Sequence, residues 1–152
     1  MSSQDFTGVS MAAPLQHLHN YWQSKLNGRI MPSRADINPA EMKAFLPLIV
    51  LFDVEAGQRL RIRLSGTRAV EAYGSEITGR YLDELELGDR REAIMAAHAQ
   101  CIASRAPHYW TDIHTRMTDG GKLRVEHLDT PLSADGETVN MLLVGAAFVV
   151  LK

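Results

Sequence analysis

The segment from Val139 to Leu151 is apolar at both alternating sets of positions. A strand has this pattern when both faces of its sheet are covered, so we predict that the segment is the central strand of a sheet. Its uninterrupted apolar run, Met141 to Leu151, has 11 residues. A helix needs about 20 apolar residues to cross a bilayer, so the run predicts a folded domain and no membrane contact.

Four further strands are predicted by short apolar or alternating runs bounded by turn residues. In the second of them, Leu60, Ile62 and Leu64 alternate with arginines, which predicts one buried and one cationic face. In the third, Tyr109 and Ile113 share the parity that we assign to the core. In chain order, the first two strands are expected at 48–54 and 59–64, and the third begins at Tyr109. The fourth is expected at 123–132 and the last at 139–151.

Helical patterns occupy the beginning and the middle of the chain. Apolar residues at spacings of three and four predict an amphipathic helix over 14–27, and a helix over 89–104 carries His98 and Cys101 on its apolar stripe. A shorter helix opens at Thr67. Residues 1–13 are small and polar, so we expect a flexible tail there. The domain then spans 14–152, with a helical flank over 14–47 and a core over 48–152.

Three separated stretches resemble one family. They are YWQSKLNGRIMPSRADINPAEMKAFLP at 21–47, LRIRLSGTRAVEAYGSEITGRYLDEL at 60–85 and HLDTPLSADGETVNMLL at 127–143. Together they resemble the compact single-domain PAS proteins common in alphaproteobacteria, over about residues 15–150. The resemblance implies an α+β PAS fold: a five-stranded antiparallel sheet with helices on one face and an N-terminal flanking helix. It also implies a bacterial, non-enzymatic, sensory or regulatory protein in signal transduction.

A PAS fold has a hollow between its helices and its sheet, and apolar walls with a few polar tips suit a small organic ligand. From their positions in the predicted elements, we expect these residues to line the ligand pocket: Tyr73, Tyr81, Leu85, His98, Ile102, Ile113 and Val125. The competing interpretation is that the same side chains only fill the core.

No cofactor is evident from the sequence. Haem-binding PAS domains take an axial histidine from the helix that here carries His98, but no further haem signal accompanies it, so haem is not favoured. Flavin-binding light sensors use a reactive cysteine on an earlier short helix, and Thr78 to Leu85 contain none, so flavin is not favoured either. Cys101 is expected to be a small buried residue that faces the pocket.

Spacing argues against a metal site. His17 and His19 point apart on a helix, and His108 and His114 are six residues apart on a strand, too far for one ion. Asp112 shares a strand face with His114, a potential acid–base pair, but the simpler interpretation is an exposed polar face. The chain carries 16 Lys and Arg against 18 Asp and Glu, so its charge of −2 does not favour nucleic acid. A single cysteine fits a cytoplasmic protein.

We expect such a domain to act through a regulatory protein partner or as a homodimer. Leu18 and Trp22 on the first helix are the candidate dimer contacts, although packing of that helix on its own sheet would give the same pattern. We expect no output domain after the last strand. Two other functions remain open: a small α+β enzyme of isomerase or hydratase type, which would need an acid beside His98, and a dimerisation or scaffold module with a filled core.

Overall fold

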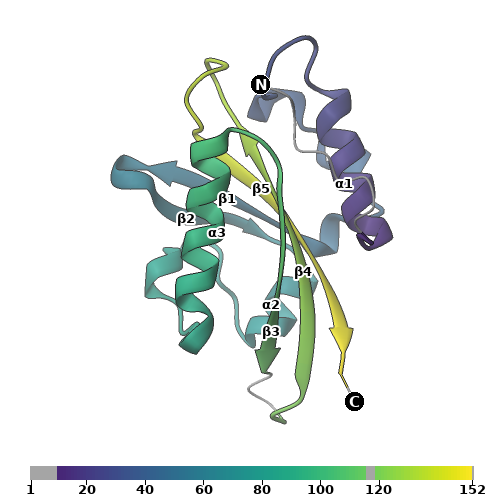
Figure 1. Ribbon diagram of the computed structural model, residues 1–152, viewed down its shortest axis with the longest axis vertical. Helices are drawn as coiled ribbons and strands as arrows, with labels where there is room; N and C mark the ends of the chain where they lie inside the picture. Colours follow the sequence, from purple (N-terminus) through teal and green to yellow (C-terminus); the bar gives the residue numbers. More distant parts are fainter. Residues whose placement is uncertain (1–9, 116–118, 152) are drawn as a thin grey trace.

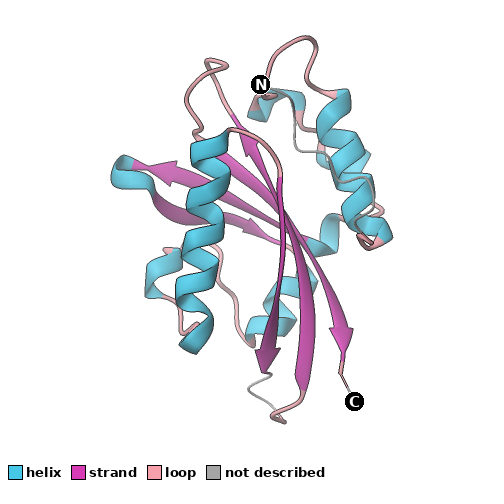
Figure 2. Cartoon of the chain, in the orientation of Figure 1, coloured by secondary structure: helices cyan, strands magenta, loops and turns pink. Residues whose placement is uncertain are grey.

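The computed structural model describes residues 10–115 and 119–151. Five antiparallel strands form one sheet in the order β2-β1-β5-β4-β3 (Figure 2). The strands are β1 Ile49–Glu55, β2 Arg59–Ser65, β3 His108–Thr115, β4 Lys122–Leu132 and β5 Met141–Val150. The α-helices are α1 Ala13–Ser24, α2 Thr67–Tyr73 and α3 Arg91–Ser104, and short 3-10 turns occupy Arg34–Asp36, Pro39–Met42, Leu46–Leu48, Ala56–Gln58, Leu82–Glu84 and Gly88–Arg90.

β5 lies in the centre of the sheet, which confirms the prediction from its two apolar faces. It pairs with β1 on one side and β4 on the other. Figure 1 shows α1 and α3 on opposite sides of the strands. Because helices cover both faces, β5 can be apolar along nearly its whole length. None of the helices in the described part of the chain is long and apolar enough to span a bilayer.

The alternation predicted for β2 holds only in part. Leu60 and Ile62 are buried, but Leu64 is 37% exposed. The register between β1 and β2 shifts at this point, so that Leu64 lies opposite Leu51 while Ile62 lies opposite Phe52. This irregularity gives Arg63 no partner in the ladder and places Leu64 on the other face from Ile62.

The first helix packs back on its own sheet. Leu18 and Trp22 are 0% and 1% exposed, and the Trp22 indole Nε1–H donates a hydrogen bond to the Pro131 carbonyl at 2.8 Å. Gly145 of β5 lies so close to α1 that a Cβ there would approach the Leu18 side chain to 2.8 Å. The prediction that Leu18 and Trp22 contact a second copy is therefore wrong, because both are used within the fold.

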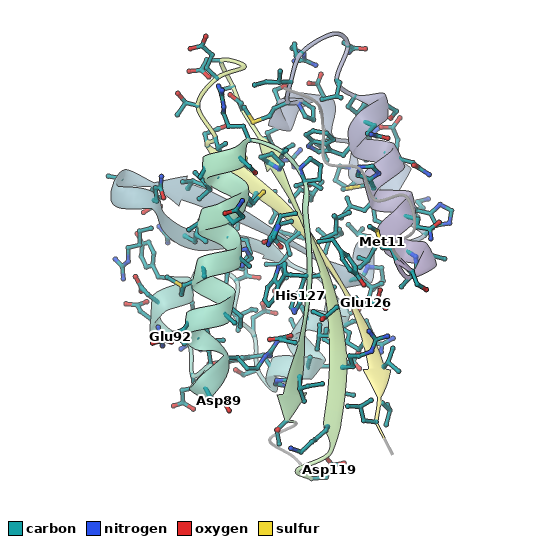
Figure 3. The ribbon with its side chains drawn as sticks, viewed as in Figure 1. Met11, Asp89, Glu92, Asp119, Glu126 and His127 are labelled. Atoms are coloured by element: carbon teal, nitrogen blue, oxygen red, sulfur yellow. The ribbon has the colours of Figure 1, made fainter. Side chains whose placement is uncertain are left out.

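The start of α1 is held by a carboxylate on the sheet. Glu126 of β4 accepts hydrogen bonds from the Ala12 backbone N–H at 3.0 Å and from the Tyr109 hydroxyl at 2.8 Å. Burial, followed by the hydrogen bond to Glu126, raises the pKa of Tyr109 to about 12. In Figure 3, Glu126 lies near Met11. The expected tail over 1–13 lies outside the described residues up to residue 9, but Met11 at its end is buried.

Replacing Trp22 tests the packing of α1. Trp22→Ala removes a buried ring and its hydrogen bond, so we expect the free energy of unfolding to fall by about 3–5 kcal/mol in urea titrations. Native mass spectrometry should show the same oligomeric state as the wild type. Gln23→Ala, at an exposed position on the same helix, serves as the control. A change of oligomeric state with unchanged stability would contradict this packing.

Gly66 provides a second test, at the junction of β2 and α2. A Cβ added there would lie 2.3 Å from the Pro47 carbonyl oxygen, which belongs to the backbone and cannot rotate away. Gly66→Ala should therefore destabilise the protein by about 3 kcal/mol, at the upper end of the cost of overpacking. Glu71→Ala, at an exposed site on α2, should change stability by no more than about 0.5 kcal/mol. Equal stabilities of the two variants would contradict the close approach.

Candidate functional site

A cavity of about 130 Å³ lies between the sheet and the segments that carry α2 and α3. We call it the sheet cavity. Phe52, Ile62 and Val144 line it from β1, β2 and β5, and Ile94 lines it from α3. The residues with polar side chains that line it are Tyr73, Arg90, His98, Trp110, His114 and His127. Most of its wall is therefore apolar, with charged and imidazole groups gathered on one side.

One pair of polar groups joins α3 to β4. His98 is 4% exposed, and its Nδ1 lies 2.8 Å from Oδ2 of Asp129, which is completely buried. The Trp110 indole Nε1–H donates to the same oxygen at 3.3 Å. An ionised carboxylate can only accept hydrogen bonds, so Nδ1 of His98 carries a hydrogen. The other oxygen, Oδ1 of Asp129, has no partner among the described residues.

A second cluster ties β3 and β4 to the start of α3. The Arg90 guanidinium donates to both oxygens of Asp112, at 2.6 and 3.0 Å, and His127 Nε2 lies 2.7 Å from Asp112 Oδ1. Arg90 also donates to Nδ1 of His114 at 2.8 Å, while His114 Nε2 donates to the Ala72 carbonyl of α2 at 2.7 Å. Four elements around the cavity are thus joined by hydrogen bonds.

The two clusters meet at stacked rings. Trp110 and His127 lie face to face, with ring centroids 3.8 Å apart and an angle of 5° between their planes. His98 meets the edge of Trp110 at a centroid distance of 6.5 Å. In Figure 3, His127 lies on the α3 side of β4 while Glu126, the next residue in the sequence, lies on the α1 side. Of these adjacent residues of β4, His127 therefore lines the cavity and Glu126 contacts the start of α1.

Burial and hydrogen bonds together set the protonation of this network. It raises the pKa of Asp112, but the hydrogen bonds from His127 and Arg90 outweigh burial and bring that pKa to about 2. Burial lowers the pKa of His127 below its usual 6.5, more than the nearby Asp112 raises it. At neutral pH the cluster therefore holds Arg90 as a cation, Asp112 as an anion and His127 as a neutral ring.

Four of the seven residues predicted from the sequence line the sheet cavity: Tyr73, Leu85, His98 and Val125. Their contact with a ligand stays a prediction. The other three lie elsewhere. Tyr81 is on the outer side of β2, where its hydroxyl donates to Glu55 at 2.7 Å and Arg59 lies 3.6 Å from its ring. Ile102 packs against the core beside the cavity, and Ile113 is 44% exposed.

Ile113 was misplaced because the two faces of β3 were assigned the wrong way round. Trp110, Asp112 and His114 face the cavity side, and Ile113 faces the other side. The prediction that Asp112 and His114 form an exposed polar face is wrong, since both bind the half-buried Arg90. Nothing in the alternation alone distinguishes a buried polar face from a solvated one; Arg90, at the start of the preceding helix, was the available signal.

Cys101 is buried but does not line the cavity. Its thiol is 3.5 Å from the Ala106 carbonyl, and burial raises the pKa of the thiol well above its ordinary value. This corrects the expectation that Cys101 faces the pocket. Groups of three His, Cys, Asp or Glu side chains suited to a metal ion do not occur within residues 10–115 and 119–151.

A second hollow of about 300 Å³ lies at the surface between the ends of α1 and α3. Arg29, Ile30 and Arg105 line it, and Arg29 is already paired with Asp36 at 2.8 Å. This pair fixes the segment after α1. The hollow lacks the converging buried groups of the sheet cavity, so we take the smaller cavity as the candidate site.

A family model described as a PAS domain matches residues 11–146 of this chain. No curated protein sequence matches this chain. Among solved structures, VqmA bound to DPO aligns at 14% identity and a TM-score of 0.55, over 66% of this chain and 51% of its own. A Rhodobacter sphaeroides LOV protein aligns at 13% identity and a TM-score of 0.53, over 66% and 58%.

A third structure is the LOV domain of the blue-light-activated histidine kinase EL346 from Erythrobacter litoralis. It aligns at 14% identity and a TM-score of 0.52, over 68% of this chain and 95% of its own. The aligned regions thus cover little more than half of VqmA and of the Rhodobacter protein, but nearly all of this isolated domain. At these identities the likeness shows a shared fold and nothing about ligands.

The protonation of His127 gives a testable pH dependence. The pKa of His127 is lower in the folded protein than in the unfolded chain, so between those two values the unfolded chain binds more protons. Stability from this group is therefore complete above about pH 6.5 and is lost as the pH falls below it. We expect urea titrations at pH 7.5 and 5.5 to show a smaller fall in stability for His127→Phe than for the wild type.

The matched control is His17→Phe, which removes an exposed histidine from α1. It should retain the wild-type fall in stability between the two pH values. If His17→Phe and His127→Phe reduce the fall equally, the buried neutral state of His127 is contradicted.

Proposed function

Because the chain belongs to the PAS domain family, we propose that it is a sensory or regulatory domain that binds a small molecule in the sheet cavity. The observation that carries this proposal is the cavity itself, an apolar hollow with a small set of converging polar groups. Such hollows are the usual form of small-molecule sites. Several neighbours of the same fold support a sensory role, and one of them is described with a bound ligand.

The surroundings of the cavity connect it to the rest of the fold. Arg90 and His98 flank the cavity at the start and in the middle of the α3 segment, and both bind carboxylates of the sheet. Glu126 connects the same strand β4 to the start of α1. A ligand that displaces the Arg90 or the His98 contact would shift α3 relative to the sheet. Ligand binding can affect another molecule only if that molecule binds the empty and the occupied domain with different affinities. We therefore propose a protein partner that distinguishes these two states.

The volume of the cavity favours a ligand smaller than flavin. Pockets for ligands of drug size have volumes of roughly 300–1,000 Å³, more than twice the 130 Å³ present here. The thiol of Cys101 also lies outside the cavity lining. Haem would require a still larger space beside His98. We therefore propose a smaller ligand than either cofactor.

Acid–base catalysis is the second candidate function, and one observation favours it. The enzyme interpretation required an acid beside His98, and Asp129 lies within hydrogen-bond distance of it. A carboxylate that orients an imidazole in an apolar cavity is a common arrangement for a general base. Incubating the protein with a ligand that copurifies with it distinguishes the two functions. Mass spectrometry should show an unchanged ligand for a regulatory domain and a chemically altered one for an enzyme.

Filling the cavity tests the proposed function. Ala146 lines the cavity from β5, so Ala146→Leu places additional carbon atoms in that space. Benzene added to the wild type should shift backbone amide resonances around the cavity in NMR spectra, and Ala146→Leu should abolish these shifts. Ala103→Leu makes the same change at an exposed position on α3 and should bind benzene as the wild type does. Equal shifts in all three proteins would place the binding elsewhere and contradict the proposal.

A further inference from the structure

The sheet cavity contains two imidazoles that are each held by a carboxylate through one ring nitrogen. His98 Nδ1 is bound by Asp129, and His127 Nε2 is bound by Asp112. In a neutral imidazole, the nitrogen that faces a carboxylate carries the hydrogen and the other nitrogen keeps a lone pair. In the neutral form of each ring, the hydrogen-bond acceptors are therefore Nε2 of His98 and Nδ1 of His127.

These two acceptor nitrogens have no hydrogen-bond partner among the described residues. His98 and His127 are only 4% and 8% exposed. Among the described residues, the fully enclosed side-chain atoms without a partner do not include Nε2 of His98 or Nδ1 of His127, so both nitrogens retain some accessible surface. Both rings line the sheet cavity, so we infer that these nitrogens are accessible from it. A buried polar atom without a partner is rare unless a ligand or water supplies one.

The strongest donors around the cavity are already engaged. Arg90 is bound by both oxygens of Asp112 and by His114, and the Trp110 N–H is bound by Asp129. The ion pair with Asp112 also neutralises the charge of Arg90. An anionic ligand would thus find no free cation here, and burying its charge unpaired would be costly. The cavity favours a neutral ligand that donates a hydrogen bond.

The volume limits the size of that ligand. An apolar protein cavity of about 150 Å³ holds one benzene molecule, and the sheet cavity measures about 130 Å³. Phe52 and Trp110 present aromatic rings to this space, and Val144 presents aliphatic carbon. One six-membered ring with a small substituent matches both the volume and the walls.

We propose that the sheet cavity binds a neutral, single-ring aromatic molecule with a hydrogen-bond donor, of the phenol type, and that this donor binds Nε2 of His98. The inference rests on the proposed function and adds the class of ligand. His98 acts as the group that selects for the donor, while the apolar walls hold the ring.

Phenol and toluene form a matched pair of probes, because they differ only in a hydroxyl replacing a methyl group. Calorimetric titrations of the full chain at pH 7.5 should show phenol binding roughly three- to tenfold more tightly, the net effect of one neutral hydrogen bond. His98→Phe should remove this preference and retain toluene binding. Failure of both probes to bind would overturn the proposed function, whereas equal affinities in the wild type would overturn only the present inference.

His98→Phe leaves the buried Asp129 carboxylate without one of its donors, so loss of folding is a real outcome for that variant. A measurement on the wild type covers this case. In protein labelled with nitrogen-15 at histidine, phenol should shift the Nε2 resonance of His98, and toluene should leave it nearly unchanged. Saturation with phenol without a selective shift of this resonance would contradict the assigned hydrogen bond.

Discussion

Two buried carboxylates on neighbouring strands organise the side of the sheet that faces α3. Asp129 is completely buried and the Asp112 side chain is 12% exposed, and a carboxylate in such a place must be hydrogen-bonded. Asp112 recruits Arg90 and His127, and Asp129 recruits His98 and Trp110. These partners come from α3, from the turn before it, and from β3 and β4. The requirement to supply hydrogen-bond donors to two carboxylates thus positions the helix, orients three rings and leaves a space between them.

Much of the fold could be predicted from the sequence. The central position of β5 followed from its two apolar faces, and the PAS fold from three separated motifs. Helix α3 was placed by the periodicity that includes His98. The positions of β5 and α3 were accessible because each depends on a local pattern of side-chain burial, which the order of apolar residues along one element records directly. The PAS fold rested on the resemblance of the three motifs to a known family.

The candidate site was predicted less completely, because it depends on pairing between elements. Ile113 was assigned to the pocket since alternation on β3 reveals two faces but not which one is inside. The inner face is polar, and it becomes compatible with burial only through Arg90, 22 residues earlier in the chain. Leu18 and Trp22 were assigned to a dimer for a related reason: an apolar stripe on α1 does not reveal which surface covers it.

The central claim is that the polar network holds open a cavity between the sheet and α3. Crystals of the protein exposed to xenon under pressure test it directly, because xenon enters apolar cavities without adding hydrogen bonds. The account predicts a xenon atom among Phe52, Trp110 and Val144, with Asp112 and Asp129 still bound to their histidines. Closely packed side chains in this region, with no xenon in the density, would contradict it.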